Sequence, residues 1–77
     1  MPTVLRNNGI EVMIYTRDHL PKHVHCFAGD EEVIISLDPL GIRVSYASNR
    51  VARQAFELVK QNKDFLIAEW DRIGPVP

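Results

Sequence analysis

Apolar and polar residues alternate in the first half of the chain in a way that predicts short β-strands. Ile10, Val12 and Ile14 recur at every second position within residues 10–17, which is the period of a strand. The segment Asn7-Asn8-Gly9 comes directly before this run and predicts a turn, because Asn and Gly tolerate a positive φ. The first predicted strand therefore directly follows this turn.

Two further strands, residues 23–28 and 32–37, are predicted on either side of Gly29-Asp30. A glycine-containing pair between two β-rich runs is typical of a hairpin loop. A shorter run over residues 42–46 alternates again and predicts a fourth strand. The first half of the chain thus predicts an antiparallel sheet of three or four strands.

Counting outward from the Gly29-Asp30 loop predicts the register of the central hairpin. Ala28 lies opposite Glu31, and the pairing continues in steps of one residue until His23 meets Ser36. Side chains alternate between the two faces of a strand. One face then carries Val24, Cys26, Val33, Ile35 and Leu37, and the other carries His23, His25, Phe27, Glu32, Ile34 and Ser36.

The second half of the chain predicts helix from a cap at Ser48 or Asn49 to about residue 73. Either one helix runs through, or two helices meet near Asn62, and the polar segment there favours a break. Apolar residues at helical spacing form two stripes. The first stripe is Ala52, Ala55, Phe56 and Val59, and the second is Phe65, Leu66, Trp70 and Ile73.

These elements predict one α+β domain over residues 1–77, in which the helices cover one apolar face of the sheet. Residues 1–47 form the sheet, residues 48–73 the helical part and residues 74–77 a tail. Trp70 and Phe56 are the expected large core residues. A chain of 77 residues is too short for a kinase, a Rossmann domain or a TIM barrel.

Composition narrows the class of protein further. The net charge of −1 lacks the basic excess typical of nucleic-acid binders, and 45% hydrophobic residues are ordinary for a soluble domain. No apolar run has the length of a membrane helix. The single cysteine, Cys26, excludes an intramolecular disulfide, so a reducing cytoplasm is the expected location. Cys26 is interpreted as a small buried hydrophobe facing away from His25.

All three histidines fall within residues 19–25, and this is the most distinctive feature of the sequence. His23 and His25 are two apart on a strand, so both are expected on one water-exposed face, with His19 reaching toward them from the connector. Two ligands on a regular element and a third on a loop are typical of metal sites. A divalent transition metal is one hypothesis, with Asp18 or Glu32 completing or orienting the ligands.

The same histidines support two other interpretations. Imidazoles titrate near neutral pH and can exchange protons in a ribonuclease-type reaction, with Arg17 or Lys22 as the cation for a phosphate. Alternatively, they hold the connector against the sheet by hydrogen bonds to the backbone, without any catalytic role. Whether the protein is an enzyme stays open at this point.

The string Asp18-His19-Leu20-Pro21-Lys22-His23-Val24-His25 resembles the bacterial proteins grouped as domain of unknown function 4160. The resemblance extends from Met1-Pro2-Thr3-Val4, through Gly9 and Tyr15, to the helical pattern with Leu58, Leu66 and Trp70. It implies a small stand-alone protein encoded beside another small protein, in a toxin–antitoxin-like pair. The positions that it transfers as a functional centre are Asp18, His19, Pro21, His23 and His25. This chain has Lys22 where the family usually has a second proline.

These observations lead to three functional hypotheses. The first is a partner-binding module that uses the histidine-bearing sheet face, or a helical surface carrying Arg50, Arg53 and Lys60 that contacts a protein partner or RNA. The second is a small ribonuclease or metal-dependent hydrolase built on the three histidines. The third is a metal-binding protein without catalysis. A homodimer formed through an exposed sheet edge is a further hypothesis.

Overall fold

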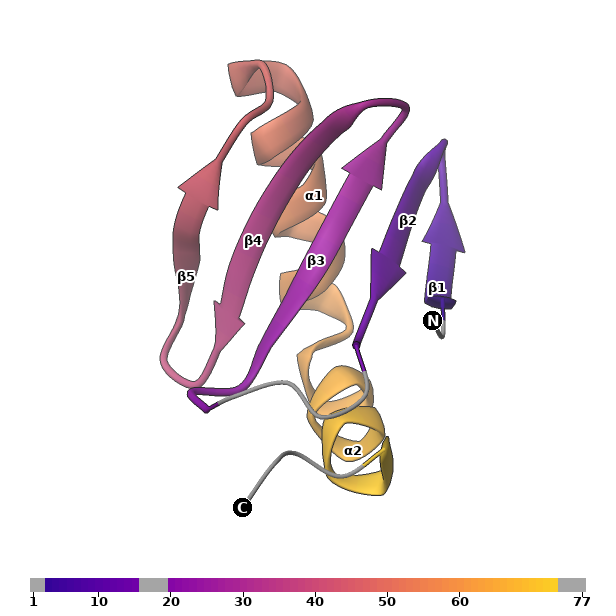
Figure 1. The fold of residues 1–77 in the computed structure, drawn as a ribbon, viewed down its shortest axis with the longest axis vertical. Helices are drawn as coiled ribbons and strands as arrows, with labels where there is room; N and C mark the ends of the chain where they lie inside the picture. Colours follow the sequence, from indigo (N-terminus) through magenta and orange to yellow (C-terminus); the bar gives the residue numbers. More distant parts are fainter. Residues whose placement is uncertain (1–2, 16–19, 74–77) are drawn as a thin grey trace.

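The computed structural model of the protein describes residues 3–15 and 20–73. These residues form a five-stranded antiparallel sheet in sequence order, followed by two helices (Figure 1). The fold class predicted from the sequence, α+β with C-terminal helices, is confirmed, with five strands where three or four were predicted. The elements are β1 (Thr3–Asn7), β2 (Ile10–Met13), β3 (His23–Ala28), β4 (Glu31–Leu37), β5 (Leu40–Ser45), α1 (Asn49–Gln61) and α2 (Lys63–Ile73).

The additional strand is β1, which the apolar pattern did not predict. The register against β2 shifts between Thr3 and Leu5, so Val4 is an extra residue in the ladder. Such a bulge interrupts the two-residue alternation by which a strand is recognised in a sequence. β1 then joins β2 through the predicted turn, in which Asn8 and Gly9 have φ values of 51° and 78°. Positive φ at both loop positions is characteristic of a tight hairpin turn.

The central hairpin has the register that the sequence predicts. Ala28 lies opposite Glu31, His25 opposite Ile34, and His23 opposite Ser36. Gly29 begins the two-residue loop with a φ of +63°, a conformation that glycine adopts without steric cost. The residues on each face of this hairpin are therefore the ones that the alternation predicted.

Three predicted strands differ from the observed ones in their bounds, although β4 differs only by starting one residue earlier, at Glu31. The strand expected over residues 10–17 ends at Met13, and its last two residues lie outside the described part of the chain. The strand expected over residues 42–46 starts earlier, as β5. Its alternation is also broken, because Val44 pairs with Ile34 whereas Ile42 pairs with Ile35. Arg43 is therefore an extra residue in the β4–β5 ladder. Ile42 lies beside Ile35, which faces the core, whereas Val44 lies beside Ile34, which faces away from the core.

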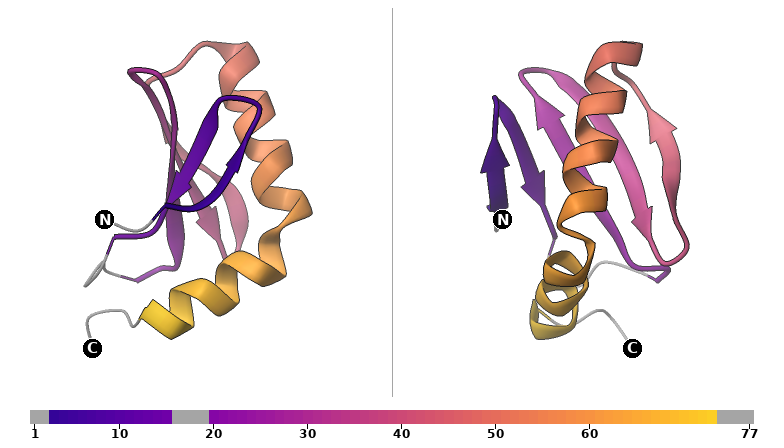
Figure 2. Two further views of the ribbon diagram at one scale, coloured as in Figure 1. Left: turned by 90° about the vertical axis from the view of Figure 1, so that its right-hand side faces the viewer. Right: turned by 180° about the vertical axis from the view of Figure 1, so that it is seen from behind.

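The core lies between the sheet and α1, as the packing argument predicted (Figure 2). Apolar residues from β2, β3 and β4 face the helix and are almost fully excluded from solvent, which is the main stabilising contribution in a domain of this size. Trp70 is 1% exposed and belongs to this core, whereas Phe56 is only half-buried. The sheet contributes Ile10, Val12, Ile14, Val24, Cys26, Val33, Ile35 and Leu37 to the core.

The helical half breaks at Asn62, as its polar segment indicated. Ser48 caps α1 by accepting a hydrogen bond from the Val51 amide at 3.2 Å. At the other end, the Asn62 side chain donates to the Leu58 carbonyl at 2.8 Å and closes the helix. α2 then turns across the end of the sheet (Figure 2). Its buried residues are Leu66 and Trp70, whereas the predicted core residue Phe65 is 47% exposed.

The sheet face that points away from α1 carries no helix over most of its area (Figure 2). We call this surface the open face. It presents half-buried or exposed side chains from four neighbouring strands, because alternate residues of each strand are directed away from the core. The residues that define it are Glu11, Met13, His25, Phe27, Glu32, Ile34 and Val44. The tail predicted for residues 74–77 lies outside the described residues.

Candidate functional site on the open face

Two cross-strand rows organise the open face. Met13, His25, Ile34 and Val44 pair in succession across β2, β3, β4 and β5. Residues paired in this way on one face of a sheet lie within contact distance of each other. The row is therefore a continuous apolar band with one imidazole in its middle. At its outer end Val44 is 38% exposed.

The second row is charged and runs parallel to the first. Glu11, Phe27 and Glu32 pair across β2, β3 and β4. Arg6 on β1 extends the row, because it forms an ion pair with Glu11 at 2.7 Å. Both carboxylates of the row are thus engaged, since Glu32 contacts His25 in the neighbouring row.

His25 is held by contacts on two sides. Its Nδ1 lies 3.1 Å from a carboxylate oxygen of Glu32, and the His25 side chain is 13% exposed. An ionised carboxylate only accepts, so Nδ1 is the donor in this hydrogen bond. The ring of Tyr15 packs against the imidazole with the ring centroids 4.4 Å apart. The sequence analysis named Glu32 as an orienting residue, whereas the contact with Tyr15 was not predicted.

His23 lies on the same face as His25 but is covered by α2. The two imidazole centroids are 5.2 Å apart, and the His23 ring also lies 5.3 Å from the indole of Trp70. His23 is only 6% exposed and the His25 side chain 13%, so the prediction that both histidines project into water is wrong: His23 is buried, and His25 is only partly exposed. His23 is buried because α2 crosses the end of the sheet and places Trp70 over it. This contact between distant parts of the chain cannot be predicted from the local sequence pattern.

The backbone of the connector orients the His23 imidazole. Nδ1 of His23 lies 2.8 Å from the carbonyl oxygen of Pro21. A carbonyl only accepts, so Nδ1 carries the proton and Nε2 has the lone pair when the ring is neutral. The predicted motif residue Pro21 therefore acts through its backbone. Lys22 anchors the same segment, since its carbonyl accepts from the Leu37 amide at 2.9 Å and its ammonium pairs with Asp71 at 3.0 Å.

Trp70 brings an unusual polar group into this region. Its Nε1 is buried, and no hydrogen-bond partner for it is present among the described residues. A buried donor without an acceptor is costly, because it has lost its hydration. Trp70 was predicted as a core residue, and its position beside His23 adds an aromatic wall to the site that the sequence did not indicate.

The remaining predicted site residues lie either outside the described part of the chain or on α1. Asp18 and His19, together with Arg17, lie outside the described residues. Within residues 3–15 and 20–73, no group of three or more His, Cys, Asp or Glu side chains is arranged to hold a metal ion. Arg50, Arg53 and Lys60 are exposed on α1, on the side of the sheet opposite the open face. Their contact with a protein or RNA stays a prediction.

A comparison with models of known protein families identifies the family of this chain. The family model described as domain of unknown function (DUF4160) matches residues 9–71, a range that contains β2 to β5, α1 and most of α2. The chain therefore belongs to the DUF4160 family, as its histidine-containing motif suggested. No curated protein and no solved structure matches it. No helix in the described part of the chain has the length and apolar character needed to cross a membrane.

Proposed function

We propose that the protein is a partner-binding module, one component of a two-gene, toxin–antitoxin-like pair, and that its open face is the docking surface. The observation that carries this proposal is the apolar row of Met13, Ile34 and Val44 with His25 in its middle. A band of partly exposed apolar side chains across several strands supplies the buried centre that a protein interface needs.

The charged row completes such an interface. Polar and charged groups at the rim of an interface set register and partner choice more than affinity. Here the carboxylates of Glu11 and Glu32 flank the apolar row. Because Glu11 is paired with Arg6 and Glu32 contacts His25, this border is polar, and it favours a partner that presents an apolar strip bordered by polar side chains. Because the backbone of a sheet is held by cross-strand hydrogen bonds, this surface is organised before a partner arrives.

The two ends of the strands contribute differently to binding. At the end near α2, His23 and Ser36 are already buried, so this part of the face supports the fold. At the opposite end, Tyr46 follows β5 and is 69% exposed, and its amide donates to the Glu32 carbonyl at 2.7 Å. Tyrosine is enriched in the energetic centres of interfaces. The docking surface therefore extends from His25 toward Tyr46.

Co-expression with the protein encoded by the neighbouring gene tests the proposal. We expect the untagged chain to co-purify with its tagged neighbour, and Val44→Lys to abolish co-purification, because a lysine places an unpaired charge in the apolar row. Phe65→Lys is the matched control, because it introduces the same charge at a similarly exposed apolar residue on α2. Failure of the wild-type pair to co-purify, or equal loss in both variants, would contradict the proposal.

A second candidate function, metal binding or His-based hydrolysis of RNA, is favoured by one specific observation. Both Nδ1 atoms, in His23 and in His25, are held by an oxygen acceptor. That arrangement fixes the orientation of each imidazole, as in many metal and acid–base sites. The contribution of His19 to this centre remains part of the proposal.

Metal titration of protein purified without a histidine tag separates this candidate from the first. Zn²⁺, Cu²⁺ and Ni²⁺ are added separately, and the fluorescence of Trp70 is recorded, since the indole lies 5.3 Å from the His23 ring. Stoichiometric binding that is lost in His25→Ala supports a metal site. RNA cleavage by the wild type, absent in His23→Ala and His25→Ala, supports hydrolysis. If neither signal is seen, the second candidate is rejected and the docking proposal is unaffected.

A further inference from the structure

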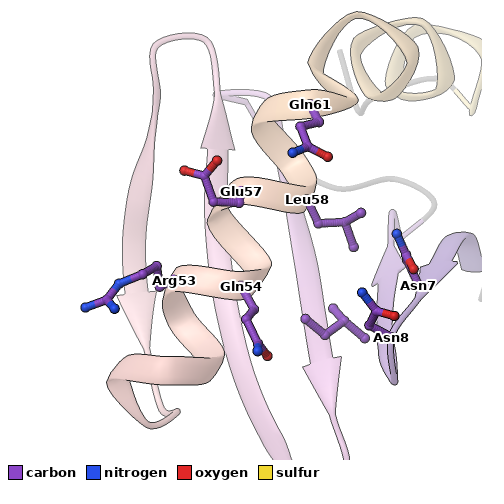
Figure 3. Close-up of a pocket in the computed structure, with 8 residues that line it drawn as sticks. Asn7, Asn8, Arg53, Gln54, Glu57, Leu58 and Gln61 are labelled. Atoms are coloured by element: carbon purple, nitrogen blue, oxygen red, sulfur yellow. The ribbon is translucent and has the colours of Figure 1, made fainter.

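A cleft on the other side of the molecule lies between the β1–β2 turn and α1 (Figure 3). Its volume is about 330 Å³, at the small end of the range of roughly 300–1,000 Å³ found for ligand pockets. Asn7 and Asn8 approach it from the hairpin, and Gln54, Leu58 and Gln61 approach it from successive turns of α1. The proposed docking surface on the open face uses none of these residues.

The lining of this cleft is unusually rich in carboxamides. The sequence contains four asparagines and two glutamines, and four of these six side chains line the cleft. None of the four takes part in a side-chain hydrogen bond within the described part of the chain. In contrast, the Asn62 carboxamide is used to close α1 by donating to Leu58. The four cleft carboxamides are therefore available to a ligand.

The inner wall of the cleft is neutral and its floor is apolar. Arg53 and Glu57 border the cleft, but in Figure 3 both extend away from the hairpin. Ile10 and Leu58 form the floor and are only 3% and 7% exposed. A ligand in this cleft meets hydrogen-bond donors and acceptors at its sides, apolar carbon beneath it, and no charge facing it across the cleft.

We propose that this cleft binds a short, uncharged, extended segment of another protein. A carboxamide offers an N–H donor and a C=O acceptor side by side, so it can pair with a main-chain peptide group through two hydrogen bonds. The apolar floor accepts one aliphatic side chain of the segment. A nucleic acid is disfavoured, because its phosphates require cations, and the Arg53 side chain at the border of the cleft extends away from the hairpin (Figure 3).

NMR titration of the full-length, ¹⁵N-labelled chain tests this proposal. The probes are acetyl-alanyl-leucyl-alanine amide, as a neutral peptide, and uridine, as a nucleobase with similar hydrogen-bonding groups. We expect the peptide to shift the side-chain NH₂ signals of the four cleft carboxamides in a saturable way, with a dissociation constant in the millimolar range. The NH₂ signals of Asn49 and Asn62 should stay unchanged.

Variants of exposed residues supply the control. Gln54→Ala and Gln61→Ala should each weaken peptide binding about five-fold, the effect of losing one net hydrogen bond. Lys60→Ala should not, because Lys60 is exposed on the same helix but does not line the cleft. Absence of a saturable shift, a response to uridine but not to the peptide, or equal weakening in Lys60→Ala would overturn the proposal. Val44→Lys should leave peptide binding unchanged, which separates this proposal from docking on the open face.

Discussion

Cys26 shows how the position of one residue on a strand decides its chemistry. It lies next to His25 in the sequence but faces the core, opposite Val33, and it is 2% exposed. Burial raises the pKa of its thiol from 9.0 to about 12, because the thiolate loses its hydration in an apolar environment. The thiol is therefore a small core hydrophobe, as predicted, and not a ligand beside the histidines.

The raised pKa of Cys26 predicts a loss of stability at alkaline pH. The unfolded chain releases the thiol proton near pH 9, whereas the folded chain retains it up to about pH 12. Above pH 9 the folded state thus binds more protons, and the free energy of unfolding should fall by up to about 1.4 kcal/mol per pH unit. Urea unfolding of the wild type and of Cys26→Ala between pH 8 and pH 10 measures this slope. An equal slope in both proteins would contradict the prediction.

The burial of Trp70 predicts that two substitutions at this position lower the free energy of unfolding by different amounts. Trp70→Ala removes a large side chain from the core and should lower the free energy of unfolding by about 3–5 kcal/mol. Trp70→Phe keeps an aromatic ring and also removes the unpartnered Nε1 donor, so its cost should stay below about 1.5 kcal/mol. Circular dichroism during urea unfolding compares the two variants. Similar losses in both variants would contradict this prediction.

At the scale of elements, turns and helix caps were the most predictable features. Asn8-Gly9 and Gly29-Asp30 close their hairpins, Ser48 begins α1, and Asn62 separates the helices. Each of these signals depends on backbone conformation or on a hydrogen bond within a few residues. Bulges in β1 and β5 interrupt the two-residue period. For this reason β1 was not predicted at all, and the alternation predicted for β5 was wrong.

The β1–β2 turn gives a prediction with a matched control. Gly9 has a φ of +78°, and no atom lies within 4 Å of the position that a Cβ would occupy. Gly9→Ala should therefore destabilise the fold by about 1–2 kcal/mol through backbone strain alone. Gly41→Ala has equally open space but no positive φ, and its effect should be much smaller. Thermal unfolding of both variants measures the difference, and equal effects would rule out strain at Gly9 as the cause.

At the scale of the whole molecule, both edges of the sheet are irregular. β1 carries an extra residue at Val4 and β5 carries one at Arg43. Bulges at the edge strands discourage the addition of another strand, because they disrupt the row of backbone groups to which it would bond. Association through the open face is consistent with this arrangement, whereas a homodimer made by pairing two edges is disfavoured.

Light scattering coupled to size-exclusion chromatography tests this expectation. The isolated chain should elute with the monomer mass of 8.8 kDa over a wide range of concentrations. Straightening the edge by deleting Arg43 should increase self-association, because it restores a regular ladder at β5. A dimeric mass for the wild type would instead support the homodimer expected from an exposed edge.

The sequence by itself determined the local structure, including the register of β3 against β4, the break at Asn62 and the inward direction of Cys26. These features depend on periodicity and on neighbours close in the chain. It also indicated the family through the motif around His23 and His25. Tertiary structure alone decided that α2 crosses the end of the sheet, so that Trp70 buries His23 while His25 stays on the open face. The path of a helix after a break depends on the fit of its apolar side chains to a surface built by distant strands, and no short segment encodes that fit.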